Sequence, residues 1–380
     1  MKLLFLLLLL GTSHFLASAQ ETPTITITKT DKLLIAIPSL SGAEGPALAK
    51  IVQSDLSLSG YFTVVSADRA VYIASGTGSS DGLRGVVKDR SGKIVLEQTF
   101  SGITRVRAHR FADAIVETLT GTRGFASTKI AFVATKSGKK EIYTADADGA
   151  NVVQLTKDGA ISVAPSLSPD GRRLVYTGYH SGYPDVYEID LGSGARQRIV
   201  KFPGTNSGAT YSPDGDRLAI TLSKDGNPEL YVTSSGGGGA RRLTRTAGVE
   251  SSPTWSPDGG EIIYSSDDRG APQLFRISAS GGSGRPLTTG HGYNTEPNWS
   301  PDGKKVAFTV REGGFRVAIL DLASGQTRVV GEGQDPVWGA DSRHLLLASG
   351  GSLVRLDTQT GARTSLASGL GKVSEPAWSR

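Results

Sequence analysis

The 380-residue sequence contains no cysteine, and its single methionine is the first residue. The missing thiols exclude a disulfide framework, a thiol nucleophile, a zinc–thiolate site and an iron–sulfur cluster. Aromatic residues make up only 7% of the chain. No charge of one sign dominates, because 41 basic and 36 acidic residues are spread along the chain and leave a net charge of +5. This mild excess gives little support to nucleic-acid binding or to a polybasic membrane contact.

Long hydrophobic runs are also missing after the first twenty residues. The N-terminus has Lys2, an apolar run from Leu3 to Leu10 and the small-residue triplet Ala17-Ser18-Ala19. This pattern predicts a secretory signal peptide over residues 1–19, cleaved after Ala19. The alternative is a membrane anchor, but the run is far shorter than the roughly 20 residues that a span needs. The sequence therefore predicts an exported, soluble mature protein.

Glycine, in contrast, is abundant, with 49 residues, and much of it belongs to an internal repeat. In each copy Pro, Asp and Gly supply the chemistry of a tight turn. Four copies follow one another at a spacing of 44 residues: Leu167-Ser168-Pro169-Asp170-Gly171, Tyr211-Ser212-Pro213-Asp214-Gly215, Trp255-Ser256-Pro257-Asp258-Gly259 and Trp299-Ser300-Pro301-Asp302-Gly303. Degenerate copies begin at Trp338, 39 residues later, and at Trp378, another 40 residues later. We call these six turns the anchors.

Short strand-like runs follow each anchor, and about four of them fit into each repeat. Four antiparallel strands in 40–45 residues are typical of a β-propeller blade. The sixth anchor lies at the C-terminus, so its remaining strands are missing there; matching runs instead precede the first anchor, at 129–133, 141–143 and 152–155. The sequence predicts a six-bladed propeller over residues 126–380, closed by strands from both of its ends.

Residues 20–125 differ from the propeller segment: they contain no anchors, and their apolar residues recur with helical periodicity. Apolar runs predict strands at 33–37 and 61–65 and a hairpin around the Asp89–Gly92 turn. One helix is expected to begin at a capping box from Ser41 to Glu44 and to end at Gly60. A second helix is expected from about Ala108 to Thr120. The prediction is a small α/β domain ahead of the propeller.

The first residues after the signal peptide alternate threonine and isoleucine. Thr24, Ile25, Thr26 and Ile27 could form a strand of the α/β domain, or a strand offered to another protein by edge addition.

Signals for catalysis or metal binding are weak. Gly78 to Gly82 matches G-x-S-x-G around Ser80, but the strand–helix context of a nucleophile elbow is missing. The histidines are far apart, and the Asp146–Asn151 segment lacks the final glutamate of a calcium loop, so a hairpin turn is favoured there. We expect no catalytic residues, no metal site and no cofactor.

A surface remains as the candidate site. The segments just before the anchors hold equivalent positions in the blades, so ring symmetry brings them together at one end of the central channel. Their short polar and acidic groups could accept hydrogen bonds from an inserted loop, or they could merely cap strand ends. The candidate partner-binding residues are Ser162, Asn206, Glu250, Ser251, Asn294, Thr295, Glu296, Asp335 and Glu375.

Six stretches of the chain carry a resemblance to a known family: Ala108–Asp113, Gly121–Phe125, Thr128–Val133, Asp146–Leu155, Asn294–Pro301 and Pro376–Ser379. In these stretches the sequence resembles the TolB family, the periplasmic β-propeller proteins of the Tol–Pal system. The resemblance implies a monomeric, non-enzymatic periplasmic adaptor that reaches membranes only through its partners and that supports outer-membrane integrity and invagination at cell division. The resemblance further implies that the channel mouth binds a Pal-like peptidoglycan-associated lipoprotein and that the segment Gln20–Thr28 contacts a TolA-like protein.

Two other functions stay open from the sequence. The anchors also occur in propellers of prolyl-oligopeptidase-like peptidases, so the chain could be a secreted hydrolase or the regulatory propeller of a peptidase system. We expect no catalytic domain, because the chain ends at Trp378-Ser379-Arg380. The other alternative is a secreted propeller that senses a small ligand in its channel.

Overall fold

The computed structural model describes residues 32–38, 40–79 and 82–379, and residues from Lys32 onward form one compact unit. The predicted signal peptide, the Thr24–Ile27 segment and Ser80 lie outside the described residues. The predicted boundary between residues 125 and 126 stays a prediction.

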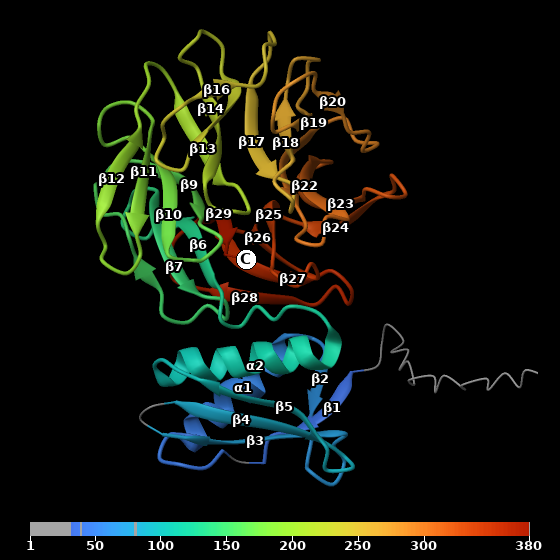
Figure 1. The fold of residues 1–380 in the computed structure, drawn as a ribbon. Coiled ribbons are helices and arrows are strands. Elements are labelled where there is room, and N and C mark those ends of the chain that lie inside the picture. Colours follow the sequence, from blue (N-terminus) through green and yellow to red (C-terminus); the bar gives the residue numbers. More distant parts are fainter. Residues whose placement is uncertain (1–31, 39, 80–81, 380) are drawn as a thin grey trace, which may run out of the picture. The chain divides into compact units, whose positions relative to one another are not determined.

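The N-terminal part is a five-stranded sheet with two helices, in the strand order β2-β1-β3-β4-β5 (Figure 1). The strands are β1 (Leu33–Ala36), β2 (Phe62–Val64), β3 (Tyr72–Gly78), β4 (Leu83–Asp89) and β5 (Ile94–Phe100). Strand β1 is parallel to β2 and β3, whereas β3, β4 and β5 run antiparallel. Strand β3 is missing from the sequence-based expectation, because its polar and glycine residues lack an alternating apolar pattern.

Two helices, α1 (Gly45–Leu58) and α2 (Thr104–Thr120), pack against each other and against this sheet. Helix α2 begins four residues earlier than expected and ends at Gly121, which has a left-handed conformation. The capping box predicted for α1 was wrong: Ser41 Oγ bonds the Gly76 carbonyl and Thr77 instead, and Pro46 opens the helix. Within the described residues, neither helix has the length and apolar run needed to cross a membrane.

Six four-stranded antiparallel sheets follow, as predicted. The first three blades are β9 (Ser162–Leu167), β10 (Arg173–Gly178), β11 (Asp185–Asp190) and β12 (Arg196–Val200); β13 (Asn206–Tyr211), β14 (Arg217–Leu222), β15 (Glu229–Ser234) and β16 (Arg241–Arg242); and β17 (Glu250–Trp255), β18 (Glu261–Ser266), β19 (Gln273–Ser278) and β20 (Arg285–Pro286). Blades four and five are β21 (Asn294–Trp299), β22 (Lys305–Arg311), β23 (Phe315–Asp321) and β24 (Thr327–Glu332); and β25 (Gln334–Trp338), β26 (His344–Ser349), β27 (Ser352–Asp357) and β28 (Arg363–Ala367).

The sixth blade combines both ends of the propeller, which confirms the predicted closure. It contains β29 (Val373–Trp378), β6 (Lys129–Ala134), β7 (Glu141–Asp146) and β8 (Val153–Gln154), in that order. Figure 1 shows the last strand, in red, beside the teal β6. Trp378 Nε1 also donates to Thr128 Oγ1 (2.7 Å), and the Lys129 amide donates to Ser379 Oγ (2.9 Å). The sixth blade therefore has its full four strands, and β6 is not left as an unpaired edge.

Each complete anchor is held by its own serine and aspartate. In the copy at residues 299–303, Ser300 Oγ donates to Asp302 Oδ1 (2.5 Å) and accepts from the Lys305 amide (2.9 Å). The same pair recurs as Ser168–Asp170 and Ser256–Asp258, each at 2.5 Å, and as Ser212–Asp214. These hydrogen bonds fix the turn that carries the chain from the innermost strand of a blade to the next strand.

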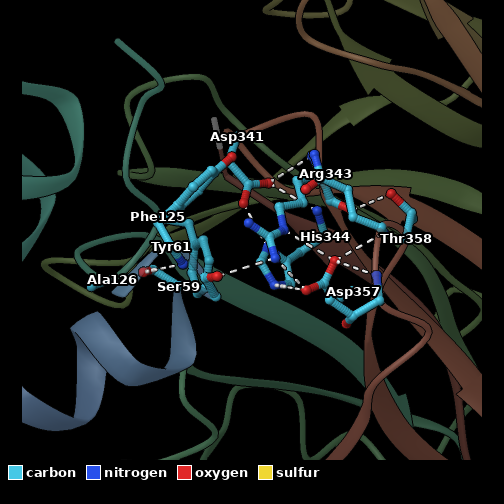
Figure 2. A network of polar contacts seen from close by, with 12 residues as sticks. Ser59, Tyr61, Phe125, Ala126, Asp341, Arg343, His344, Asp357 and Thr358 are labelled. Carbon is cyan, nitrogen blue, oxygen red and sulfur yellow. Dashed lines mark hydrogen bonds and ion pairs between the residues drawn. The ribbon is translucent and has the colours of Figure 1, made fainter. Parts of the chain in front are cut away.

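The α/β part contacts the anchor end of blade five (Figure 2). Arg343 donates to both carboxylate oxygens of Asp357 (3.0 and 2.6 Å) and to the Gly60 carbonyl (3.3 Å), and its guanidinium lies 4.5 Å from the Tyr61 ring centre. Although burial opposes it, hydrogen bonding from Arg343 holds the pKa of Asp357 below its usual range.

Candidate functional site

Every blade has a β-bulge in its innermost strand, at the third residue of the strand or its equivalent. One residue of each bulge has a positive φ: Ala164 (51°), Gly208 (64°), Ser252 (51°), Glu296 (52°), Asp335 (54°) and Glu375 (50°). Five of these six are not glycine, although the left-handed region costs such residues roughly 1–2 kcal/mol each. Backbone strain of this kind concentrates at functional sites. We call these six residues the bulge ring.

The bulge ring surrounds one end of a central cavity of about 770 Å³. All six blades line this cavity, and Pro165, Pro253, Pro297, Pro336 and Pro376 follow the bulge residues into it. Deeper in the cavity lie the prolines of the four complete anchors, together with Trp255, Trp378 and Arg123. The cavity is therefore the central channel predicted from the sequence. We call the end at the bulge ring the channel mouth.

Three consecutive blades carry carboxylates at the bulge position, and these side chains link each blade to the next. Glu296 Oε2 accepts hydrogen bonds from the Asp335 amide (3.0 Å) and from Thr309 Oγ1 (2.7 Å). Asp335 Oδ2 accepts from the Glu375 amide (3.0 Å), and Glu375 Oε2 accepts from the Ala164 amide (2.7 Å). Each carboxylate is thus fixed at the wall of the channel with acceptor capacity left over.

Glu296 and Asp335 are close enough for the charge of Glu296 to act on Asp335. Burial raises the pKa of Asp335, and the negative charge of Glu296 raises it further. Glu375 is paired with Lys140, whose Nζ lies 3.2 Å from Oε1. This side of the mouth therefore offers hydrogen-bond acceptors to a partner that brings donors.

Exposed apolar side chains surround the mouth. Half of the large apolar side chains that are exposed in the described residues lie at this end: Ile161, Tyr179, Tyr183, Val249 and Phe315. Tyr183 is 72% exposed, and Tyr179 lines the channel. Such a grouping, mixed with polar groups, is typical of a protein-binding surface.

The structure brings five of the nine predicted residues to the mouth or next to it. Ser251, Glu296, Asp335 and Glu375 line the channel, and Thr295 is a partly exposed neighbour of Glu296. The other four, Ser162, Asn206, Glu250 and Asn294, have no exposed surface. Their expected place on the surface was wrong, because the first residue of each innermost strand points into the boundary with the preceding blade.

At this boundary the buried residues pair with the blade before them. Asn294 Nδ2 donates to Gln273 Oε1 (2.7 Å), and Asn206 Nδ2 donates to Asp185 Oδ1 (3.3 Å). An amide suits the position because it can donate to the preceding blade and accept from its own loop, as Asn294 Oδ1 does from Thr289 Oγ1 (2.9 Å).

Glu250 has no amide nitrogen to donate at the same position. It faces Glu229, which is fully buried as well, and one oxygen of each carboxyl group, Oε2, receives no hydrogen bond from a nitrogen or hydroxyl donor. Burial, hydrogen bonding with Glu229 and the charge of Glu229 raise the pKa of Glu250 to about 7. In its protonated form Glu250 can donate to Glu229, so that a proton shared by the two carboxyl groups takes the place of the asparagine donor of the flanking blades.

Among the described residues, the side chains considered for catalysis or metal binding do not gather at one place. Asp146 accepts hydrogen bonds from Arg105 and Asn151 (both 2.7 Å) in the hairpin turn between β7 and β8, which confirms the turn interpretation. In the described ranges, no group of three or more His, Asp or Glu residues could hold a metal ion. The four described histidines pair with four different carboxylates: His109 with Asp55, His180 with Asp158, His291 with Glu312 and His344 with Asp341.

Sequence reasoning placed Ala164, Gly208 and Ser252 in the segments before the anchors but did not select them as candidate binding residues. A recurring signal for them is the proline that follows the bulge residue in five of the six blades. Arg123, from the segment after α2, was missed too, because its approach to the channel depends on packing between distant parts of the chain.

Comparisons with known proteins agree with this geometry. Residues 116–380 match the family described as the TolB beta propeller domain. The chain is 33% identical over 199 residues to a Protein TolB homolog from Chlorobium chlorochromatii, and 35% identical over 188 residues to a Tol-Pal system protein TolB from Geobacter metallireducens. These alignments cover 42% and 40% of this chain, and 45% and 43% of the relatives. The aligned part therefore spans less than half the length of these curated relatives.

A solved structure gives a wider match. The crystal structure of TolB from Acinetobacter baumannii superposes with a TM-score of 0.81 at 27% sequence identity. It covers 92% of this chain and 97% of the other chain, so the likeness includes the α/β part as well as the propeller.

Proposed function

Because this chain belongs to the TolB β-propeller family, we propose that it is a non-enzymatic periplasmic adaptor of a Tol–Pal system. In this proposal the channel mouth binds a Pal-like lipoprotein, and residues 20–28 contact a TolA-like protein. The adaptor then supports outer-membrane integrity and the invagination of the envelope at cell division. The predicted signal peptide would deliver it to the periplasm.

The observation that carries the proposal is the composition of the mouth. A cavity of about 770 Å³ opens between carboxylates at fixed positions and a border of exposed aromatic and aliphatic side chains. Pockets that accept an anchoring side chain, bordered by polar groups, are the usual centres of protein interfaces. The carboxylates would accept hydrogen bonds from a loop of the lipoprotein, and the apolar border would pack around its base.

A binding experiment tests the proposal. We expect the mature protein to capture the soluble domain of the Pal-like lipoprotein from its own organism, and we expect Glu296→Arg to weaken the complex at least tenfold in titration calorimetry. Reversing a carboxylate at the centre of an interface places like charges together and removes an acceptor. Deleting residues 20–28 should abolish capture of the TolA-like protein and leave capture of the lipoprotein unchanged.

Glu117→Arg is the matched control, because Glu117 is exposed on α2 and does not line the channel. Thermal melting shows whether the Glu296 variant is folded, and Ser251→Arg repeats the test without breaking the Glu296–Asp335 hydrogen bond. Wild-type affinity in both folded mouth variants would contradict the proposed interface.

A further inference from the structure

The three carboxylates of the bulge ring differ in how their charge is balanced. Glu375 uses both of its oxygens: Oε1 lies 3.2 Å from Lys140 Nζ, and Oε2 accepts from the Ala164 amide (2.7 Å). The negative charge of Glu375 is therefore balanced within the protein. The other two carboxylates belong to Glu296 and Asp335, on blades four and five, and we call them the carboxyl pair.

Hydrogen bonds hold the carboxyl pair at the boundary between its two blades. Glu296 Oε2 accepts from the Asp335 amide (3.0 Å) and from Thr309 Oγ1 (2.7 Å). Asp335 Oδ2 accepts from the Glu375 amide (3.0 Å) and from Gln334 Nε2 (3.4 Å). The remaining oxygens, Glu296 Oε1 and Asp335 Oδ1, receive no hydrogen bond from a nitrogen or hydroxyl donor of the described residues. Each side chain is half-buried and lines the channel.

The surrounding strands bring no cation to the carboxyl pair. The charged residues on the strands packed against β25 are Glu296 on β21, Lys305 and Arg311 on β22, Arg316 and Asp321 on β23, His344 on β26 and Glu375 on β29. Lys305 stands opposite Asp321 in the sheet, and His344 is paired with Asp341. In the described ranges, no basic group lies within ion-pair distance of the carboxyl pair. Two neighbouring like charges without a cation do not both ionise readily.

A shared proton resolves this conflict in the free protein. Burial raises the pKa of Asp335 to about 8, and the charge of Glu296 and hydrogen bonding with Glu296 add to the rise. Because the two groups titrate together, this pKa belongs to the pair. Glu229 and Glu250 share a proton in the same way, but they have no exposed surface. The carboxyl pair, in contrast, opens into the channel, where a partner can reach it.

We propose that a lysine or arginine side chain of the partner replaces the proton shared by Glu296 and Asp335 at the channel mouth. The proton leaves to the solvent as the cation arrives, so the total charge at the carboxyl pair stays the same. The cation then donates charge-assisted hydrogen bonds to Glu296 Oε1 and Asp335 Oδ1. A neutral donor would not balance the second negative charge, and the proton would stay. This inference rests on the proposed function, since it assigns the chemistry of the partner group at the same mouth.

The exchange makes binding depend on pH with a defined sign. The free protein holds the proton below the pKa of the pair, whereas the complex does not hold it. Affinity therefore rises with pH up to about pH 8 and levels off above that value. For the release of a single proton, the association constant should increase about 50-fold between pH 6 and pH 8.

The test counts the protons that are released when the complex forms. The mature chain is titrated with the soluble domain of the Pal-like lipoprotein in a calorimeter at pH 7, in phosphate and in Tris, which take up a proton with different heats. We expect close to one proton per complex from the wild type. Asp335→Asn keeps the shape and donates permanently to Glu296, and Glu296→Gln removes the second charge. Both variants should release no proton and should lose the rise in affinity between pH 6 and pH 8.

Glu250→Gln is the matched control, because it removes the other shared proton at a boundary without exposed surface. This variant should release as many protons as the wild type, and melting temperatures check the fold of every variant. A wild-type complex that forms without releasing a proton would overturn the exchange and leave the proposed function intact. The same holds if both carboxyl-pair variants release as many protons as the wild type. If the wild-type chain binds no lipoprotein between pH 6 and pH 9, the proposed function itself fails.

Discussion

Glu250 differs from the residues that hold its position in the flanking blades. Asn206 and Asn294 each donate an amide N–H to the preceding blade. Glu250 can do so only while it carries a proton, because ionised carboxylates are acceptors alone. A single residue type thus makes one of the blade boundaries sensitive to pH.

This sensitivity has a defined sign. The pKa of Glu250 is raised to about 7 in the folded protein, above the value of about 4.3 expected in the unfolded chain. Stability from this group is fully present below the unfolded pKa and is lost as the pH rises through the folded pKa. Glutamine keeps the shape of Glu250 and adds a permanent donor. We therefore expect the stability of Glu250→Gln relative to wild type to be higher at pH 8 than at pH 4.5 by roughly 1–3 kcal/mol.

Urea unfolding of both proteins at several pH values measures this difference. Asn206→Asp is the reciprocal variant: it places a second carboxyl group opposite Asp185 and should create a similar loss of stability at higher pH. A stability difference between Glu250→Gln and wild type that does not change from pH 4.5 to pH 8 would contradict the shared proton.

At the scale of the element, the innermost strand of each blade supplies the bulge residue that surrounds the mouth. Alternation alone would point its third residue toward one face of the sheet, but the bulge shifts the register and turns that residue to the channel. Hydrogen bonds from the bulge amides to the neighbouring blade fix the shift, as in the 2.7 Å bond from Ala164 to Glu375. The left-handed conformation is thus imposed by contacts outside the strand.

The bulge predicts unequal effects of the same substitution at two adjacent residues. Ser252 has a φ of 51°, whereas Ser251 pairs regularly with Ser265 in the sheet. We expect Ser252→Val to destabilise the protein by about 1–2 kcal/mol, because a β-branched side chain is poorly tolerated at positive φ. Ser251→Val should stay within about 0.5 kcal/mol of wild type, since valine suits extended backbone. Denaturant unfolding measures both changes. Equal losses of stability would show that the positive φ of Ser252 is not what makes this position sensitive to valine.

At the scale of the whole molecule, closure of the ring is the decisive contact. Strand β29 pairs with β6 from the other end of the propeller, as in the pairing of Trp378 with Ile130, which lie 248 residues apart in sequence. Trp378 also packs edge-on against Phe125, with 5.4 Å between the ring centres. The last strand is therefore the innermost strand of the sixth blade, and it carries Glu375 of the bulge ring.

Deleting residues 371–380 should consequently lower the melting temperature by more than about 10 °C, since the change removes a full strand pairing and opens two sheet edges. Differential scanning calorimetry gives the comparison with the full chain. A synthetic peptide of the deleted residues should restore part of the stability when added in excess. An unchanged melting temperature would mean that the pairing of β29 with β6 does not hold the ring.

The sequence alone determined the number of blades, the anchors, the closure and most of the α/β elements. These features depend on turn chemistry and strand patterns that are local, such as the serine–aspartate pair of each anchor, or that repeat at a fixed spacing along the chain. It also located the acidic residues of the mouth, because residues at equivalent positions of successive blades lie at the same end of the ring.

Only the tertiary structure decided which of those residues face the channel. Glu250 and Glu296 both precede an anchor and look equivalent as polar residues, yet Glu250 is buried against Glu229 while Glu296 lines the mouth. The difference comes from a two-residue offset in the strand and from the bulge, which is set by hydrogen bonds to the next blade, about 40 residues away in sequence. Contacts between blades are not encoded in any local pattern, so burial at the blade boundary emerges only when the ring is assembled.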